Sequence, residues 1–398
     1  MKCKVSGKNI TPFMSFGKMP MANGFITKKN FKNEFFYKLE VGFCEYNYLF
    51  QVNNHPKSQN IFNNKYPFFT SKSKFMRSHF KNYFLWSKKK YLNNNSKIVE
   101  IGSNDGTFLN HFKKNNYEHY GFEPSKNVAN LSKKFDLKIV NDFFNFNNAS
   151  KLTKFKSNTD LICAANVISH VPDLNDLIKG VECLLSKKGV FIFEEPYLGS
   201  MFKKISYDQI YDAHLFIFSL HSVREIFKKF DLELIDAYPQ TTHGGSMRYV
   251  IGRKKINEVS KRIKILINKE LSMNLNNIKS CFEFKNKCEQ SRKKFKDKLV
   301  SFKKKGYTIC GYAASAKSTT LLNYCNINTD IIDYIADSTN EKIGKFSPGM
   351  HIPIVPIEFF KKNPADIAIL LSWNHKKEIL LKEKNFTKNG GKWVWHTQ

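Results

Sequence analysis

The stretch that decides the fold is "KIVEIGSNDGTFLNHF", residues 97–112. An apolar run at 97–101 leads into a turn from Gly102 to Gly106, and residues with helical spacing follow. Glycine lets a backbone turn tightly and approach a ligand closely, and the first turn of a helix presents unpaired N–H groups. This segment therefore predicts a strand, a ligand-binding turn and a helix in succession.

The identity of the ligand depends on the acidic residues around this turn. A second strand-like run, "HYGFEP", ends at Glu123, and an acid in that place suits ribose hydroxyls in dinucleotide and S-adenosylmethionine folds alike. A dinucleotide turn reads GxGxxG and offers bare backbone to a pyrophosphate. This turn contains Asp105, which would repel a pyrophosphate but suits the cationic methionine end of S-adenosylmethionine. The sequence favours a methyl-donor site over a dinucleotide site.

The residues expected to hold this donor follow successive strands. Asp142 and Phe143 follow the third strand and would face the adenine, and Asn166 at the end of the fourth would face the donor. The full predicted set is Glu100, Gly102, Asn104, Asp105, Gly106, Glu123, Asp142, Phe143 and Asn166.

The chain alternates strand-like and helix-like segments from 97 to about 253 and again from 306 to 390. Such alternation predicts an α/β protein with a parallel sheet covered by helices on both faces, of Rossmann-like type. We expect a small loop-rich module at 1–85, a donor-binding domain at 86–253, one or two long linking helices at 254–305, and a second α/β domain at 306–398.

The net charge of +31 does not by itself indicate a nucleic-acid partner. Lysines are scattered through every segment, whereas base recognition favours arginine. No apolar run reaches the roughly 18 residues of a membrane span, and the first residues lack the apolar core of a secretory signal. The sequence predicts a cytoplasmic protein with neither a nucleic-acid partner nor a membrane span.

Several segments occur in fixed order, among them "VEIGSNDGTFL", "FEPSKNVAN", "ANVISHVPDLNDLI", "THGGSMRY" and "GYAASAKSTTLLNYC". Together they resemble the nucleotide-sugar C-methyltransferases, which add a branch methyl to a 4-keto-deoxysugar carried on a nucleoside diphosphate. The resemblance runs over nearly the whole chain. It implies a zinc-binding N-terminal module, a class I methyltransferase domain that binds S-adenosylmethionine, and a C-terminal α/β domain that helps to hold the nucleotide sugar. It also implies a role in surface polysaccharide or glycoconjugate synthesis.

A base is needed for this chemistry, because a methyl sulfonium forms a carbon–carbon bond only with a carbon that has lost a proton. His214 matches the family's proposed base, in a motif that usually reads Tyr-His-Glu-His. Here Tyr211 and His214 remain, and Ala213 replaces the glutamate. Asp212 or His170 could compensate, so the predicted catalytic residues are His214, Tyr211 and His170. The alternative is that His214 caps a buried polar network.

The acceptor is expected to lie among residues from four segments. Tyr66 resembles the family's aromatic stretch over donor and sugar, and His243 and Gly244 match its "THGGS" segment, which could equally be a tight turn that needs glycine. Glu195 and Tyr197 follow the fifth strand, at the edge where ligands lie in such sheets.

The second α/β domain contributes the expected diphosphate site. Lys317 and Ser318 stand at a predicted helix start after a turn of small residues, an arrangement that suits phosphate. The alternative is a surface lysine on a packing helix.

The metal site of the family is incomplete here. Family members carry two CxxC pairs, which supply four thiolates to tetrahedral zinc. Cys3 and Cys44 remain, but Ser6 and Asn47 stand in the other two positions. We expect no tightly bound structural zinc. These substitutions and Ala213 leave two other functions open: a sugar O-methyltransferase, or a donor-binding scaffold that has lost catalysis.

Overall fold

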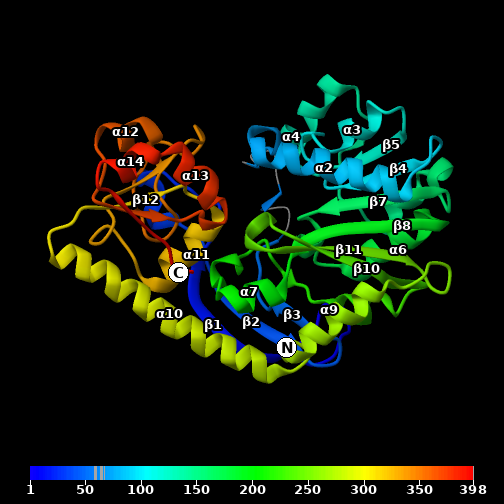
Figure 1. Ribbon diagram of the computed structural model, residues 1–398, viewed down its shortest axis with the longest axis horizontal. Helices are drawn as coiled ribbons and strands as arrows, with labels where there is room; N and C mark the ends of the chain where they lie inside the picture. Colours follow the sequence, from blue (N-terminus) through cyan, green and yellow to red (C-terminus); the bar gives the residue numbers. More distant parts are fainter. Residues whose placement is uncertain (58–60, 63–65, 67, 398) are drawn as a thin grey trace.

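The computed structural model describes residues 1–57, 61–62, 66 and 68–397, which form three lobes around three sheets (Figure 1). The first lobe holds a four-stranded antiparallel sheet in the order β1-β2-β3-β9. Its strands are β1 (Thr11–Pro20), β2 (Phe36–Cys44), β3 (Leu49–Val52) and β9 (Phe216–Ile217). The short last strand comes from the middle of the chain, so this lobe is not confined to the predicted module at 1–85.

The second lobe holds a seven-stranded sheet in the order β10-β11-β8-β7-β4-β5-β6. Its strands are β4 (Lys97–Ile101), β5 (Glu118–Phe122), β6 (Ile139–Val140), β7 (Thr159–Ala165), β8 (Leu185–Pro196), β10 (Leu232–Gln240) and β11 (Ser246–Arg253). The five strands from β8 to β6 are parallel, and β10 and β11 are antiparallel. Read from β6 to β8, the parallel strands are the third, second, first, fourth and fifth of the five in the chain, which is the order of doubly wound sheets. The predicted Rossmann-like α/β class is confirmed.

Helices cover both faces of this sheet because neighbouring strand residues point to opposite sides. The helices are α2 (Lys74–Tyr91), α3 (Leu109–Lys113), α4 (Lys126–Ser132), α5 (Phe146–Ser150), α6 (Leu174–Leu184) and α8 (Leu220–Phe227). The short helix α7 (Leu198–Lys204) packs instead with the first sheet and α10. Ile98 packs in the cluster that contains α2 and α3, whereas its neighbour Val99 packs in the cluster that contains α6 and α8. The predicted boundary at residue 85 falls inside α2, which belongs to this lobe by its packing.

The third lobe holds a five-stranded parallel sheet in the order β14-β13-β12-β15-β16. Its strands are β12 (Ile309–Tyr312), β13 (Tyr334–Asp337), β14 (Ile354–Pro356), β15 (Ile367–Leu370) and β16 (Lys392–Val394). Its helices are α11 (Ala316–Cys325), α12 (Ile357–Lys362), α13 (Lys376–Lys382) and α14 (Lys384–Lys388). A second α/β unit is present here, as the sequence predicts.

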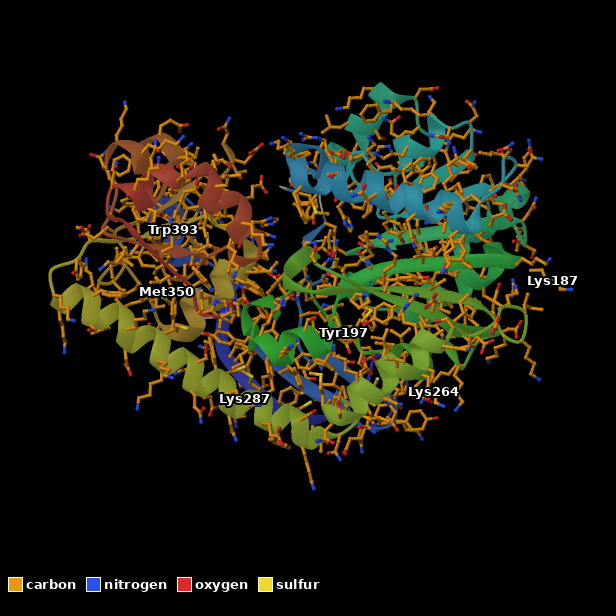
Figure 2. All side chains as sticks on the ribbon, viewed as in Figure 1. Lys187, Tyr197, Lys264, Lys287, Met350 and Trp393 are labelled. Carbon is orange, nitrogen blue, oxygen red and sulfur yellow. The ribbon has the colours of Figure 1, made fainter. Side chains whose placement is uncertain are left out.

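Two helices, α9 (Lys261–Ser272) and α10 (Ile278–Lys304), connect the second and third lobes along the outside of the first (Figure 1). Phe284 and Leu299 of α10 join one apolar cluster with Phe50 of the first sheet and Ile309 of the third. Lysines cover the solvent side, and Figure 2 shows Lys264 and Lys287 on the outer margin. In the part of the chain described, no helix is both long and apolar enough to cross a membrane.

Candidate active site

A cavity of about 700 Å³ lies where the three lobes meet. Asn23 lines it from the first lobe, Gly102 and Asn166 from the second, and Lys317 from the third. The residues expected to hold donor and acceptor therefore face one shared space.

The carboxyl ends of β4 and β7 form one end of the cavity. Gly102 has φ +71°, and a Cβ there would lie 2.3 Å from Val167 Cγ2, so only glycine fits this approach. Glu100 is buried, and its Oε2 has no hydrogen-bond partner among the described residues. Burial raises the pKa of Glu100 well above its usual range, and nearby Asp105 and Glu123 add to the rise. Asn166 likewise leaves its buried Oδ1 without a partner in the described structure.

Glu123 is fixed at the end of β5 by two backbone groups. Its Oε1 accepts a hydrogen bond from Ser125 N at 2.8 Å, and its Oε2 accepts one from Asn104 N at 3.0 Å. Each carboxylate oxygen can accept more than one hydrogen bond, so both can still receive ligand hydroxyls. Phe143 lines the same part of the cavity.

His214 lies in the loop after η6 (Tyr207–Gln209), with its ring buried and against the cavity. Its Nδ1 lies 2.7 Å from the Gln209 carbonyl oxygen. A carbonyl only accepts, so Nδ1 carries the proton and Nε2 is the bare nitrogen. The Tyr211 hydroxyl lies 2.8 Å from Nε2 and donates to it. Burial lowers the pKa of His214 well below 6.5, and His170 beside it contributes.

The predicted catalytic residues are thus brought together. The His170 and His214 rings are 5.2 Å apart, and His170 Nδ1 donates to the Ala213 carbonyl. Ala213 lines the cavity but offers no polar side chain. Asp212 does not take over from the missing glutamate, because its Oδ2 accepts from Ala22 N at 2.8 Å in a buried contact with the first lobe.

Comparison with known families and proteins agrees with this geometry. Residues 3–62 match a model described as a putative zinc binding domain, residues 74–237 match a methyltransferase domain, and residues 241–397 match a C-methyltransferase C-terminal domain. The chain is 26% identical over 397 residues to the C-methyltransferase NovU of Streptomyces niveus, covering 99% of this chain and 94% of that protein. The chain is an S-adenosylmethionine-dependent methyltransferase that is similar to a C-methyltransferase over nearly its whole length.

Solved structures similar to the methyltransferase match only part of it. One is a possible histamine N-methyltransferase of Thermotoga maritima, 20% identical over 46% of this chain and 92% of that chain, with a TM-score of 0.35. Another is the magnesium protoporphyrin IX methyltransferase of Synechocystis PCC 6803 with bound S-adenosylmethionine, 12% identical over 45% of this chain and 79% of that chain, also with a TM-score of 0.35.

The donor end of the methyltransferase fits S-adenosylmethionine. Glu100 and Asn166 present buried acceptor oxygens without partners in the described structure, which suits the amino and hydroxyl hydrogens of that molecule. Glu123 stands at the place of the ribose-binding acid, and Gly102 leaves room for close approach.

Three predicted donor residues have structural contacts instead of a place in the cavity lining. Asp105 Oδ2 accepts from Ser71 N at 2.8 Å and its Oδ1 accepts from Thr107 Oγ1 at 2.6 Å. A Cβ on Gly106 would lie 2.4 Å from Leu137 Cδ1, so this glycine serves packing. Asp142 accepts from Asn148 Nδ2 at 2.9 Å. Glu100, not Asp105, is the acid that faces the donor end.

Glu195 and Tyr197 also differ from their predicted role at the acceptor. Glu195 Oε1 accepts from Val167 N at 2.8 Å and Ile168 N at 2.6 Å, so it fixes the segment between Asn166 and His170. Tyr197 belongs to an apolar core cluster near the centre of the molecule (Figure 2). The end of β8 thus stabilises residues that line the cavity, and neither Glu195 nor Tyr197 lines it.

The third lobe supplies cationic groups to the cavity. Lys317 Nζ donates to the His243 carbonyl at 3.2 Å, and burial lowers the pKa of Lys317 to about 8. His243 lines the cavity beside it, in a strained turn with φ 52°. Lys317 is therefore not a surface lysine, contrary to the alternative left open by the sequence.

Two neighbours of these residues have other tasks. Ser318 forms a capping box with Ser315 at the start of α11, and it is Ser315 that lines the cavity. A Cβ on Gly244 would lie 2.3 Å from Trp373 Cη2, so this position needs glycine for packing in the turn. Tyr66, which the sequence predicts at the acceptor, lines the cavity.

The four positions of the family's metal site lie together in the first lobe. Asn47 Nδ2 lies 3.6 Å from Cys3 Sγ, and Ser6 Oγ lies 3.5 Å from Cys44 Sγ. A hydrogen bond with Cys44 lowers the pKa of Cys3. Within the described residues, no group of three or more His, Cys, Asp or Glu side chains is arranged to hold a metal ion. The absence of zinc remains a prediction.

Sequence reasoning missed several polar residues of the cavity, among them Asn23 and Lys342. Asn23 lies in a turn after β1, where Asn-Gly signals only a turn. Lys342 comes from a long loop of the third lobe, and its Nζ donates to the Ala314 carbonyl at 2.6 Å. Neither residue belongs to a sequence motif with a known chemical role, so only the folded chain shows that they lie at the site.

Proposed function

We propose that this C-methyltransferase adds a methyl branch to the carbon next to the keto group of a nucleotide-activated 4-keto-deoxysugar. The observation that carries the proposal is the position of His214, a buried neutral base that faces the same cavity as the donor-binding strand ends and Lys317. A base, a donor site and a cationic site in one cavity match the three parts of such a reaction.

His214 would take the proton from the carbon beside the ketone. Its Nε2 carries the free electron pair, and the hydrogen bond from Nδ1 to Gln209 stabilises the imidazolium that forms. The electrons left on the acceptor form an enolate, whose carbon is the nucleophile. S-adenosylmethionine, when bound, supplies a methyl group on a cationic sulfonium. The cavity walls would hold the two reacting carbons roughly 3–3.5 Å apart.

The nucleotide part of the acceptor is supported by charge. Lys317 and Lys342 line the cavity on the side of the third lobe, and α11 begins there with its N-terminus. A helix N-terminus and buried ammonium groups together favour a phosphate-bearing ligand.

The replacement of the family's glutamate by Ala213 favours a second candidate function, sugar O-methylation, because a changed environment of the base could redirect the methyl to an oxygen. The purified chain would be given methyl-labelled S-adenosylmethionine and a panel of nucleotide-linked 4-keto sugars. We expect NMR to place the label on a methyl bonded to a quaternary carbon. A methyl bonded to oxygen would select the second candidate, and no turnover on any keto sugar would count against both.

We infer that the product serves surface polysaccharide or glycoconjugate assembly. The support is the nucleotide-linked form of the proposed acceptor, which is the activated form that glycosyl transfer consumes. Loss of the gene is expected to leave the cell-surface glycan without its C-methyl sugar, as composition analysis would show. An unchanged composition would contradict this role.

A further inference from the structure

The turn that follows β1 carries the first lobe into the cavity. Gly24 N donates to the Met21 carbonyl at 2.9 Å and closes the turn. Ala22 within it is 2% exposed, whereas Asn23 is exposed and lines the cavity. Asn23 is thus the residue that this turn offers to a ligand.

Each of the other two lobes forms a hydrogen bond with a backbone group of Ala22. Its N–H donates to Asp212 Oδ2 at 2.8 Å, and its carbonyl accepts from Thr319 Oγ1 at 2.7 Å. Both contacts are buried, and a buried hydrogen bond is costly to break. Asp212 belongs to the loop that carries His214, and Thr319 belongs to α11, which carries Lys317. The position of Asn23 is therefore fixed relative to the base and to the cationic wall at once.

These two hydrogen bonds of Ala22, which we call the Ala22 clamp, also affect which side chains reach the cavity together. Because Asp212 holds Ala22, the residues that follow them, Ala213 and Asn23, both reach the same cavity. Ala213 brings no polar group, whereas the amide of Asn23 brings a donor and an acceptor. A sugar with a keto oxygen and a neighbouring hydroxyl needs both kinds of partner.

We propose that Asn23 binds the sugar part of the acceptor beside His214 and determines which keto sugar is accepted. The amide would donate to the keto or hydroxyl oxygen and accept from a hydroxyl. This assignment rests on the proposed function, because it takes the acceptor to be a keto sugar.

The test compares Asn23→Ala and Asn23→Asp with the wild type on the acceptor that the wild type methylates. We expect KM for the acceptor to rise at least about tenfold in Asn23→Ala, since a site built around a polar group discriminates strongly when that group is lost. The Kd of S-adenosylmethionine by calorimetry and the melting temperature should stay at wild-type values. Asn33→Ala, an exposed asparagine of the same lobe outside the cavity lining, is the matched control and should behave as wild type.

A second variant tests the Ala22 clamp. Thr319→Val removes the hydroxyl that holds Ala22 and keeps the side-chain shape; we expect it to raise the acceptor KM more than it lowers kcat, and Thr319→Ser to restore it. An unchanged acceptor KM and sugar preference in Asn23→Ala would overturn the assignment alone. A wild type that methylates no keto sugar would overturn the proposed function, and this assignment with it.

Discussion

The imidazole of His214 is held by two hydrogen bonds of opposite sense. Nδ1 donates to a backbone carbonyl, and Nε2 accepts from the Tyr211 hydroxyl. The first bond fixes the tautomer, and the second occupies the nitrogen that must receive the proton. A bound acceptor would therefore take the place of the Tyr211 hydroxyl at Nε2, or be reached through it.

Replacing the base should stop the reaction and leave the donor site intact. We expect His214→Asn to lower kcat by about 10²–10⁴-fold, the usual contribution of a general base, with the Kd of S-adenosylmethionine unchanged by calorimetry. Tyr211→Phe, which keeps the ring and loses the hydroxyl, should lower kcat by less. A His214→Asn enzyme within a few-fold of the wild type would remove His214 from the mechanism.

The acid limb of the pH profile should lie lower than for an ordinary histidine. Burial holds the pKa of His214 well below 6.5, so the free base persists when the pH falls through that value. We expect kcat/KM for the acceptor to stay level from pH 7.5 through about 6.5 and to fall only below it. A half-maximal rate at about pH 6.5 would show that the group is not buried in this way.

The alkaline limb should report Lys317. Its pKa of about 8 means that the ammonium group loses its charge as the pH rises through that value. We expect KM for the phosphate-bearing acceptor to increase above about pH 8, while the Kd of the donor does not. Lys317→Arg, which keeps its charge over this range, should remove the increase; an increase that persists in this variant would assign the limb to another group.

At the scale of elements, the turn after β4 shows what the sequence could and could not predict. Apolar runs and helical spacing predicted β4, β5, β7, β8 and the helices between them, because burial of one face imposes those periods. The direction of each side chain within the turn was not predictable. Asn104 has φ 49°, and the Asp105 carboxylate that follows it accepts from Ser71 N and Thr107 Oγ1, whereas Glu100 on β4 lines the cavity.

The same limit applies at the other strand and helix ends. Glu195 was predicted at the correct edge of the sheet, yet its carboxylate accepts hydrogen bonds from backbone N–H groups of a neighbouring loop. At α11 the hydroxyl of Ser318 is used by the capping box, a signature that the Ser-x-x-Ser spacing carries only weakly. Which polar group meets the ligand depends on tertiary hydrogen bonds, whereas the place of the site depends on strand order alone.

The role of Asp105 in the turn can be tested by a substitution that replaces one carboxylate oxygen with an NH₂ group. In the wild type, Ser71 N and Thr107 Oγ1 each donate to the Asp105 carboxylate. Asp105→Asn places an NH₂ group against one of these donors, so one buried hydrogen bond is lost. We expect unfolding free energy to fall by about 1–3 kcal/mol and the donor Kd to weaken, because η2 (Thr70–Lys72) packs on this residue. Asp142→Asn, the same change at an exposed site, is the control. Equal stability of both variants in thermal unfolding would contradict this account.

At the scale of the whole molecule, the three lobes are less separate than the sequence indicates. One apolar cluster runs from Phe50 of the first sheet through Phe284 of α10 to Ile309 of the third. The predicted boundaries follow composition along the chain, whereas packing joins segments that are distant in sequence. The cavity at their junction could not be assigned to one domain for this reason.

The cluster of Cys3, Ser6, Cys44 and Asn47 retains the dimensions of a metal site. The separations of 3.5 Å between Ser6 Oγ and Cys44 Sγ and of 3.6 Å between Asn47 Nδ2 and Cys3 Sγ lie close to the roughly 3.8 Å between sulfurs in a zinc tetrahedron with bonds of about 2.3 Å. We expect the double variant S6C/N47C to bind one zinc per chain by elemental analysis, with a higher melting temperature than its chelated form. The wild type should contain no zinc after the same purification. Zinc in the wild type, or none in the variant, would contradict the prediction.

Strand β9 has a consequence for how the protein is made. Its residues Phe216 and Ile217 pair with Gln51 and Phe50, and Val52 N donates to the Leu215 carbonyl at 2.8 Å. The ribosome releases β1, β2 and β3 well before this partner, so the growing chain exposes an unpaired strand edge while residues 53–215 are being made. The nascent protein therefore has a long interval in which chaperones must guard that edge from aggregation.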